Sequence, residues 1–155
     1  MSEYTHSITW TPFDASSYKI GIVTGQFNPE ACEDLVTSAQ SKLTEYSISN
    51  ENIDTFRVSG SAELPVVLKH LAETGTYDAL VAVGVLIRGA TVHFDYVAKL
   101  ATEGVLKVQM DTGIPIGFAV LMLENQDQLA DRVRVGGDAA EAVLQSLKVI
   151  KRLNK

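Results

Sequence analysis

The stretch YDALVAVGVLIRGATVHFDYV, residues 77 to 97, decides the fold of this chain. Its first half, Leu80 to Ile87, contains no charged residue and is mostly β-branched or aliphatic. Such a run is typical of a strand buried on both faces, as in a parallel sheet covered by helices. The second half turns the chain at residues 88–91 and continues from His93 with helical spacing. We therefore predict a buried strand, a short turn and a helix in direct succession.

The turn between this strand and this helix has the properties of an anion-binding site. A strand that ends in a glycine turn before a helix directs unpaired backbone N–H groups toward one point, where the helix dipole also favours negative charge. The turn leads to His93, and histidine is the one residue type whose unperturbed pKa lies near neutrality. A lone histidine is often structural, but the position of this one favours catalysis. An anion site beside a proton carrier predicts an enzyme that acts on a small molecule.

The rest of the chain alternates in the same way between strands and helices. Further strands are predicted at 19–24, 53–58 and 116–122. Helices are predicted at 29–46, 65–73, 91–110 and 139–153, with a short one at 126–133 and a break at Gly136-Gly137. Alternation of this kind gives parallel strands joined by right-handed crossovers. The predicted fold class is α/β, a three-layer α/β/α sandwich with a four-stranded parallel sheet, in a single domain of residues 1–155.

Two finer expectations accompany this fold. The helix at 91–110 should turn an apolar stripe toward the sheet, formed by Val97, Leu100, Ala101, Val105 and Val108. Residues 1–18 should form an N-terminal arm, in which Ser7 to Trp10 could be a short strand. The arm is either a frayed tail or a strand that pairs with the sheet edge of a neighbouring subunit.

Composition and charge exclude several classes of function. Apolar residues make up 46% of the chain and charged residues 21%, as is ordinary for a soluble globular protein. The net charge of −6 argues against a general nucleic-acid or anionic-membrane binder. No secretory signal and no apolar run of the ~20 residues that cross a bilayer are present, and the single Cys32 cannot form an internal disulfide. We therefore expect a cytoplasmic protein with no metal site, no nucleic-acid partner and no membrane partner.

Candidate binding residues follow the other strands at the same edge of the predicted sheet. Ligands of α/β proteins bind at the carboxyl ends of the strands. Phe27 follows the first strand and either packs in its loop or stacks on a substrate. Gly60 permits a close approach of backbone to ligand, and Glu63 either complements a helix dipole or takes part in the chemistry. The chain contains no GxxxxGK[ST], GxGxxG or GxSxG motif, so nucleotide binding is unsupported.

The segment VGVLIRGATVHFDYVA, residues 83–98, closely resembles the signature of the 6,7-dimethyl-8-ribityllumazine synthase family of riboflavin biosynthesis. Four further matches occur in the family's order: FN at 27–28, VSGSAELP at 58–65, GIPIGFAVL at 113–121 and ENQDQLADR at 124–132. The resemblance covers about residues 18 to 150. It implies a flavodoxin-like fold and a transferase that needs no cofactor. That enzyme would condense 5-amino-6-(D-ribitylamino)uracil with 3,4-dihydroxy-2-butanone 4-phosphate to the lumazine, with loss of phosphate and water.

The resemblance also implies roles for individual residues. His93 would transfer protons during imine formation and elimination. The phosphate would be held by Gly89, Ala90 and Thr91, and by Arg132 from a neighbouring subunit. The other substrate would be bound or bordered by Phe27, Asn28, Ser61, Ala62, Glu63, Val85, Leu86 and Ile87, with Phe118 of the neighbour covering its ring. The family further implies a homo-oligomer, either a pentamer or a sixty-subunit shell, with each site between adjacent subunits.

Several positions depart from the family's pattern. The family usually has GNKG after the position of Arg132, with a lysine that addresses the pyrimidine, whereas residues 133–139 read VRVGGDA and are shorter. Ser59 replaces a proline, Ala62 a bulky residue, and Val92 a threonine near the phosphate. These changes keep a second hypothesis open, namely a homologous shell-forming or flavin-binding protein that has lost efficient turnover.

Overall fold

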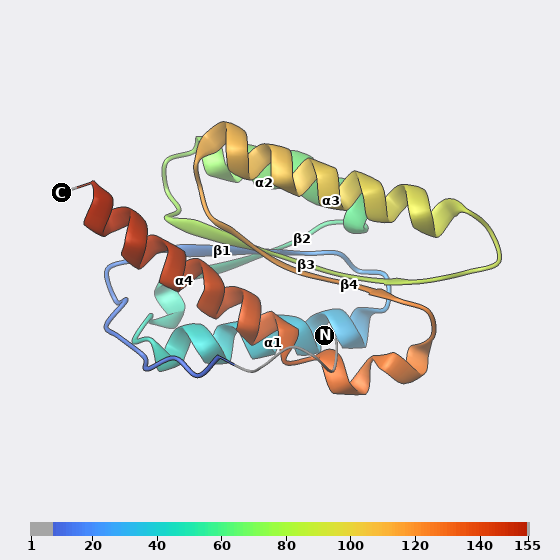
Figure 1. Ribbon diagram of the computed structural model, residues 1–155, viewed down its shortest axis with the longest axis horizontal. Coiled ribbons are helices and arrows are strands. Elements are labelled where there is room, and N and C mark those ends of the chain that lie inside the picture. Colours follow the sequence, from blue (N-terminus) through green and yellow to red (C-terminus); the bar gives the residue numbers. More distant parts are fainter. Residues whose placement is uncertain (1–7, 155) are drawn as a thin grey trace.

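The computed structural model describes residues 8–154 and has the predicted α/β architecture. Four strands, β1 (Ile20–Thr24), β2 (Ile53–Arg57), β3 (Ala79–Ile87) and β4 (Ile116–Leu123), form one parallel sheet in the order β2-β1-β3-β4. The long helices are α1 (Pro29–Glu45), α2 (Leu64–Glu73), α3 (His93–Thr112) and α4 (Val135–Leu153). In Figure 1, α1 and α4 cover one face of the sheet and α2 and α3 cover the other. The three-layer fold class is therefore confirmed.

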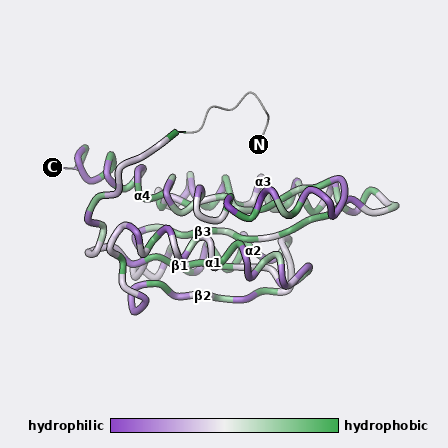
Figure 2. Tube along the Cα trace, turned by 90° about the horizontal axis from the view of Figure 1, so that it is seen from below, coloured by the Kyte–Doolittle hydropathy of each residue, from purple (hydrophilic) through white to green (hydrophobic). Residues whose placement is uncertain are grey.

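Strand β3 is the centre of this sheet because it pairs with strands on both sides. Val81, for example, lies opposite Ile22 of β1 and Gly117 of β4. Residues 79–85 of β3 are all buried, since helices cover both faces of the sheet. Hydrophobic residues accordingly follow one another along β3, whereas they alternate with hydrophilic ones along the helices (Figure 2). The uncharged run in the sequence reflects this burial on two faces.

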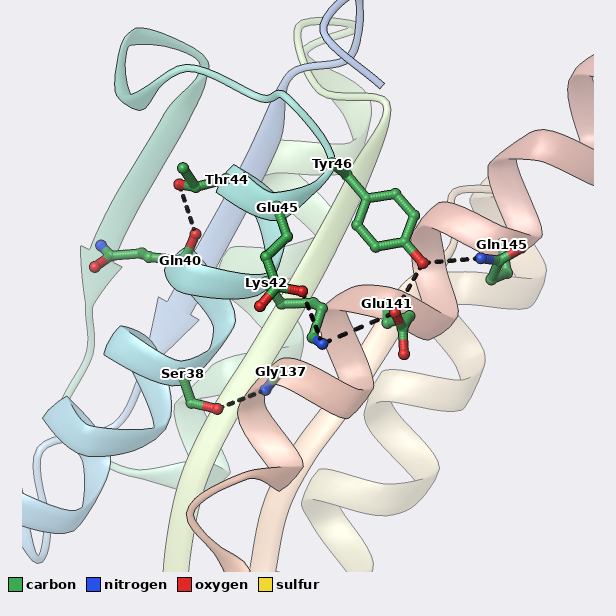
Figure 3. A network of polar contacts seen from close by, with 9 residues as sticks. All are labelled: Ser38, Gln40, Lys42, Thr44, Glu45, Tyr46, Gly137, Glu141 and Gln145. Carbon is green, nitrogen blue, oxygen red and sulfur yellow. Dashed lines mark hydrogen bonds and ion pairs between the residues drawn. The ribbon is translucent and has the colours of Figure 1, made fainter. Parts of the chain in front are cut away.

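A polar network joins the layer formed by α1 and α4 (Figure 3). The hydroxyl of Tyr46, just after α1, donates to Glu141 Oε2 at 2.7 Å and accepts from Gln145 Nε2 at 3.0 Å. The side chain of Tyr46 is fully buried. Burial, together with the hydrogen bond to the Glu141 carboxylate, raises the pKa of Tyr46 to about 12. The network therefore places a neutral phenol donor beside a partly buried carboxylate oxygen.

The predicted helix break at Gly136-Gly137 is wrong, because α4 begins at Val135 and includes both glycines. A Cβ atom on Gly136 would collide with the backbone carbonyl of Leu35 in α1. The N–H of Gly137 donates to Ser38 Oγ of α1 at 3.0 Å. The glycines therefore allow α1 and α4 to pack backbone to backbone, and they do not end a helix.

Two other details also differ from expectation. The short helix predicted at 126–133 is instead a pair of 3₁₀ turns, Gln126–Gln128 and Ala130–Arg132. Leu100 is 55% exposed, so the predicted apolar stripe of α3 is wrong at this position, although Ala101 and Val105 are buried. Neighbouring residues differ by about 100° around a helix, which turns Leu100 away from the face that Ala101 shares with Val105.

The segment before β1 has no strand within the described residues. Ile8 to Trp10 adopt no regular secondary structure, and Ser7 lies outside the residues that the structure describes. Farther along, Phe13 packs edge-to-face on Tyr46 with ring centroids 5.0 Å apart, and the N–H of Ala15 donates to the Tyr46 carbonyl at 2.8 Å. The end of the predicted arm thus belongs to the core of its own chain.

Between residues 8 and 154, no helix is both long enough and apolar enough to pass through a membrane.

Candidate functional site

A cleft of about 500 Å³ opens at the carboxyl ends of β1 and β3. Most of the site residues predicted from the sequence line it: Phe27, Asn28, Ser61, Ala62, Glu63, Val85, Leu86, Ile87, Gly89, Thr91 and His93. They come from the end of β3 and from the segments that follow β1, β2 and β3, up to the first residue of α3. The parallel sheet brings these loops to one edge, as the alternation of strands and helices predicts.

The loop after β1 presents Phe27 to the cleft through an unusual backbone at Asn28. Asn28 has φ 59° and ψ 62°, in the left-handed region that asparagine tolerates better than most residues. Its Nδ2 donates to the carbonyl of Val85 at 3.2 Å, and its own carbonyl accepts from the N–H of Cys32 at 3.1 Å. The loop is thereby tied to the end of β3. Phe27, next to this anchor, is left 67% exposed.

The loop after β2 forms the wall against which Phe27 lies. A Cβ atom on Gly60 would be only 2.7 Å from Phe27 Cδ2, so only a glycine leaves room for the ring where it stands. Glu63 Oε2 accepts from the N–H of Gly60 at 2.9 Å, and the N–H of Glu63 donates to the Gly60 carbonyl at 3.1 Å. This reciprocal pair of hydrogen bonds fixes the Glu63 carboxylate at the cleft and at the start of α2. Glu63 is therefore placed both to complement the helix dipole and to take part in the chemistry.

The loop after β3 brings the predicted anion site and His93 into the same cleft. Gly89 faces open space, with no protein atom within 4 Å of where a Cβ would be. The Oγ1 of Thr91 accepts from the N–H of His93 at 3.3 Å. His93 is the first residue of α3 and is exposed. An anion in this loop would meet free N–H groups at the positive end of a 20-residue helix, within reach of an imidazole.

Cys32 contributes to the scaffold of this site and not to its reactivity. Its buried Sγ donates to the carbonyl of Phe27 at 3.3 Å. Burial raises the pKa of the Cys32 thiol, so it stays protonated, whereas a nucleophilic cysteine needs a lowered pKa. In the described part of the chain, no three His, Cys, Asp or Glu side chains gather in a way that could hold a metal ion.

Three predicted residues do not line the cleft of the single chain, namely Ala90, Phe118 and Arg132. Phe118 lies in β4 opposite Ala82, half-buried against the α2 and α3 side of the sheet. Arg132 lies in the second 3₁₀ turn, where its Nη1 donates to the carbonyl of Gln128 at 2.8 Å. The resemblance assigns Phe118 and Arg132 to the site of a neighbouring subunit, a prediction that one chain does not test.

Two lining residues, Phe94 and Val97, were missed by the sequence analysis. Val97 was expected to face the sheet, but it also borders the cleft because it lies one helical turn after His93. The spacing His93-Val97 in the sequence could have indicated this. Phe94 carried no such signal, since its direction depends on a contact with Arg88 that only the fold creates.

Comparison with known proteins shows the family of this chain. The family model of 6,7-dimethyl-8-ribityllumazine synthase matches residues 17–151. A 6,7-dimethyl-8-ribityllumazine synthase of Lawsonia intracellularis (strain PHE/MN1-00) is 37% identical over 92% of this chain and 94% of its own length. A protein of the same name from Nitratidesulfovibrio vulgaris (strain DP4) is 36% identical over 90% and 93%. The family predicted from the sequence is confirmed: this chain belongs to the 6,7-dimethyl-8-ribityllumazine synthase family, transferases of riboflavin biosynthesis.

Proposed function

We propose that this chain condenses 5-amino-6-(D-ribitylamino)uracil with 3,4-dihydroxy-2-butanone 4-phosphate to 6,7-dimethyl-8-ribityllumazine and releases phosphate. The single observation that carries this proposal is the cleft of about 500 Å³, in which Phe27, Glu63 and His93 meet the loop after β3. Its volume lies within the range of roughly 300–1,000 Å³ that is usual for small-molecule sites. Family membership supplies the reaction, and the cleft supplies a place for it.

The pyrimidine substrate occupies the wall formed by the first two loops. Phe27 stacks on the ring, since its side chain lies against Gly60 and is still 67% exposed. Residues 85–87 border the ring along the end of β3. Ser61, Ala62 and Glu63 hold the ribityl chain, whose hydroxyl groups donate to the Glu63 carboxylate, and Asn28 keeps the Phe27 loop in place through its bond to Val85.

The phosphate substrate occupies the loop after β3. The N–H groups of Gly89, Ala90 and Thr91 bind the phosphate oxygens at the start of α3, and Arg132 of an adjacent subunit adds a positive charge. His93 stands beside this site and moves protons during imine formation and phosphate elimination. Phe118 of the adjacent subunit closes the cleft over the pyrimidine ring. The protein is accordingly a homo-oligomer, a pentamer or a larger shell, and works in the cytoplasm.

These parts suffice for the chemistry. Holding two reactants in a productive geometry can lower a barrier by ~7–11 kcal/mol in favourable cases. One positioned acid–base group adds a further factor of ~10²–10⁴. The alternative of a shell-forming or flavin-binding homologue without turnover is not favoured, because both relatives are named as synthases.

The test is to incubate the purified protein with both substrates and to follow the absorbance of the lumazine. Formation well above the spontaneous rate is expected. No turnover above that rate, combined with tightly bound flavin, would refute the proposal and favour the alternative.

A mixing experiment tests the assignment of His93 and Arg132 to different subunits. We expect His93→Ala and Arg132→Gln each to lower kcat sharply without dissolving the oligomer, which sedimentation would check. When the two variants are unfolded together and refolded as mixed oligomers, some sites should combine an intact His93 with an intact Arg132 from the neighbour. Activity should then return. No recovery would place both groups in one chain's site, and an unchanged rate in His93→Ala would remove the histidine from the mechanism.

A further inference from the structure

Arg88, the first residue after β3, makes contacts in three directions. Its Nε donates to Glu124 Oε2 at 2.9 Å. Its Nη1 donates to both carboxylate oxygens of Asp95, at 3.1 and 3.3 Å. The guanidinium carbon lies 4.5 Å from the ring centroid of Phe94, and the backbone N–H donates to the carbonyl of Leu123 at 2.8 Å. The side chain is thus held along its edge by two carboxylates and on its face by an aromatic ring.

These contacts connect the two ends of the loop that precedes α3. Asp95 lies in the first turn of α3, two residues after His93, and Glu124 follows β4 directly. The guanidinium therefore bridges the end of the sheet and the start of the helix. The hydrogen bonds to Glu124 and Asp95 raise the pKa of Arg88, so it stays charged throughout the working pH range.

Arg88 itself does not line the cleft, whereas Phe94, on which it stacks, does. Exposed ion pairs typically contribute little to stability, so a gain in stability does not explain this cluster. Its geometry is more informative. A planar guanidinium that stacks on a ring and donates to two carboxylates favours one conformation of the loop. This loop carries the proposed phosphate site and leads to His93.

We infer that Arg88 is a positioning residue, which fixes the loop of residues 88–92 and the first turn of α3 for phosphate binding and proton transfer without touching the phosphate. The inference rests on the proposed function and assigns this residue a task within it. Arg88 acts through Asp95 on the helix that begins with His93, and through Phe94 on the wall of the cleft.

The experiment compares Arg88→Gln and Arg88→Lys with a matched control, Arg57→Gln. Arg57 makes the same type of exposed pair, with Glu33 at 2.9 and 3.0 Å, but does not line the cleft. Both Arg88 variants should lower kcat by about 10- to 100-fold, the cost of a small misplacement of reacting groups, with little change in KM for the phosphate substrate. Lysine should fail to restore kcat, because an ammonium can neither stack nor bridge in this way. The control should match the wild type.

A double-mutant cycle identifies the partner. Asp95→Asn should lower kcat by itself and add little to the effect of Arg88→Gln, since both changes break the same contact. If Arg88→Gln does not fold, Asp95→Asn and Glu124→Gln each remove one carboxylate contact and should give the same loss in kcat at constant KM.

Three kinetic outcomes would overturn the inference. A rise in KM for the phosphate substrate at constant kcat would make Arg88 a direct phosphate ligand. Full activity of Arg88→Lys would show that charge alone matters, and unchanged kinetics would show no role. Amide hydrogen exchange separates this question from the proposed function. Exchange at the amides of Asp95 and Tyr96, which donate to the carbonyl of Val92 at 3.0 and 3.4 Å, should accelerate in Arg88→Gln and not in Arg57→Gln, even if the wild type forms no lumazine. Unchanged exchange would refute positioning, whereas absent turnover would refute the proposed function.

Discussion

Replacing Gly60 by alanine should weaken binding of the pyrimidine substrate while leaving the fold intact. Gly60 has φ −154° and ψ −173°, an extended backbone that alanine adopts without strain. The N–H of Gly60, which donates to Glu63, is retained in the variant. The only new feature is a methyl group 2.7 Å from Phe27 Cδ2 and 2.8 Å from Cε2. The perturbation is therefore confined to the position of one aromatic ring.

The size of the effect follows from how far this ring must move and from where it can go. Carbon atoms in favourable contact lie about 3.5–4.0 Å apart, so the ring must retreat by about 1 Å. Phe27 is 67% exposed and can swing toward solvent, so the free energy of unfolding should fall by less than ~1 kcal/mol. Stacking of an aromatic side chain on a heterocyclic base contributes ~1–3 kcal/mol. Losing most of it should raise Kd for the pyrimidine substrate about 5- to 100-fold.

The assay is calorimetric titration of the pyrimidine substrate, paired with chemical unfolding of the same samples. Gly89→Ala is the matched control, because no protein atom lies within 4 Å of its added methyl group and the residue borders the other half of the cleft. It should leave pyrimidine affinity unchanged. An unchanged Kd in Gly60→Ala would refute stacking by Phe27. A loss of stability of several kcal/mol would refute the claim that the ring is free to move.

Two further substitutions test the layer formed by α1 and α4. Gly136→Ala places a methyl group against the backbone carbonyl of Leu35, which cannot swing away, so the free energy of unfolding should fall by ~1–3 kcal/mol or more. The control Gly89→Ala should change the free energy of unfolding little. Urea unfolding at equal protein concentration checks this, and equal stability of the two variants would contradict the close packing of α1 and α4. Tyr46→Phe should cost ~1–3 kcal/mol near neutral pH because the Glu141 carboxylate loses its donor. Because the pKa of Tyr46 is raised from 10.0 to about 12, its contribution to stability is complete below pH 10 and is lost as the pH rises through 12. Across this pH window the free energy of unfolding should therefore fall less in Tyr46→Phe than in the wild type. An equal fall in both proteins would contradict the assignment.

The sequence predicted those parts of the fold whose signals are local. The uncharged run in β3 follows from burial on both faces, and the strand boundaries agree with the prediction to within one residue. The loops that carry Phe27, Glu63 and His93 could be placed at one edge because parallel strands bring all their carboxyl ends together. Periodicity and topology were enough to predict that most of the cleft residues, which come from three distant segments, lie together.

The errors concern features that depend on a partner element. Gly136 and Gly137 indicated a break because glycine is a poor helix former, yet α4 uses them to approach α1. Leu100 was assigned to the core from its spacing, but the sheet beneath α3 covers only a narrow face of that helix. The residue pattern of α3 or α4 does not indicate where the element that packs against the helix lies. Tertiary packing therefore overrides propensity at these residues.

The cleft of the single chain is open in a way that bears on the proposed assembly. Phe27 is largely exposed, and His93 faces solvent at the start of α3. A condensation that proceeds through an imine is favoured by excluding water, and an aromatic ring binds a heterocycle best when the other side of the heterocycle is covered. Phe118 has the chemistry to supply that cover, and Arg132 has the positive charge that a phosphate needs. Both lie outside the cleft of their own chain. In the proposed site shared between subunits, each chain would complete the cleft of its neighbour with residues that do not line its own.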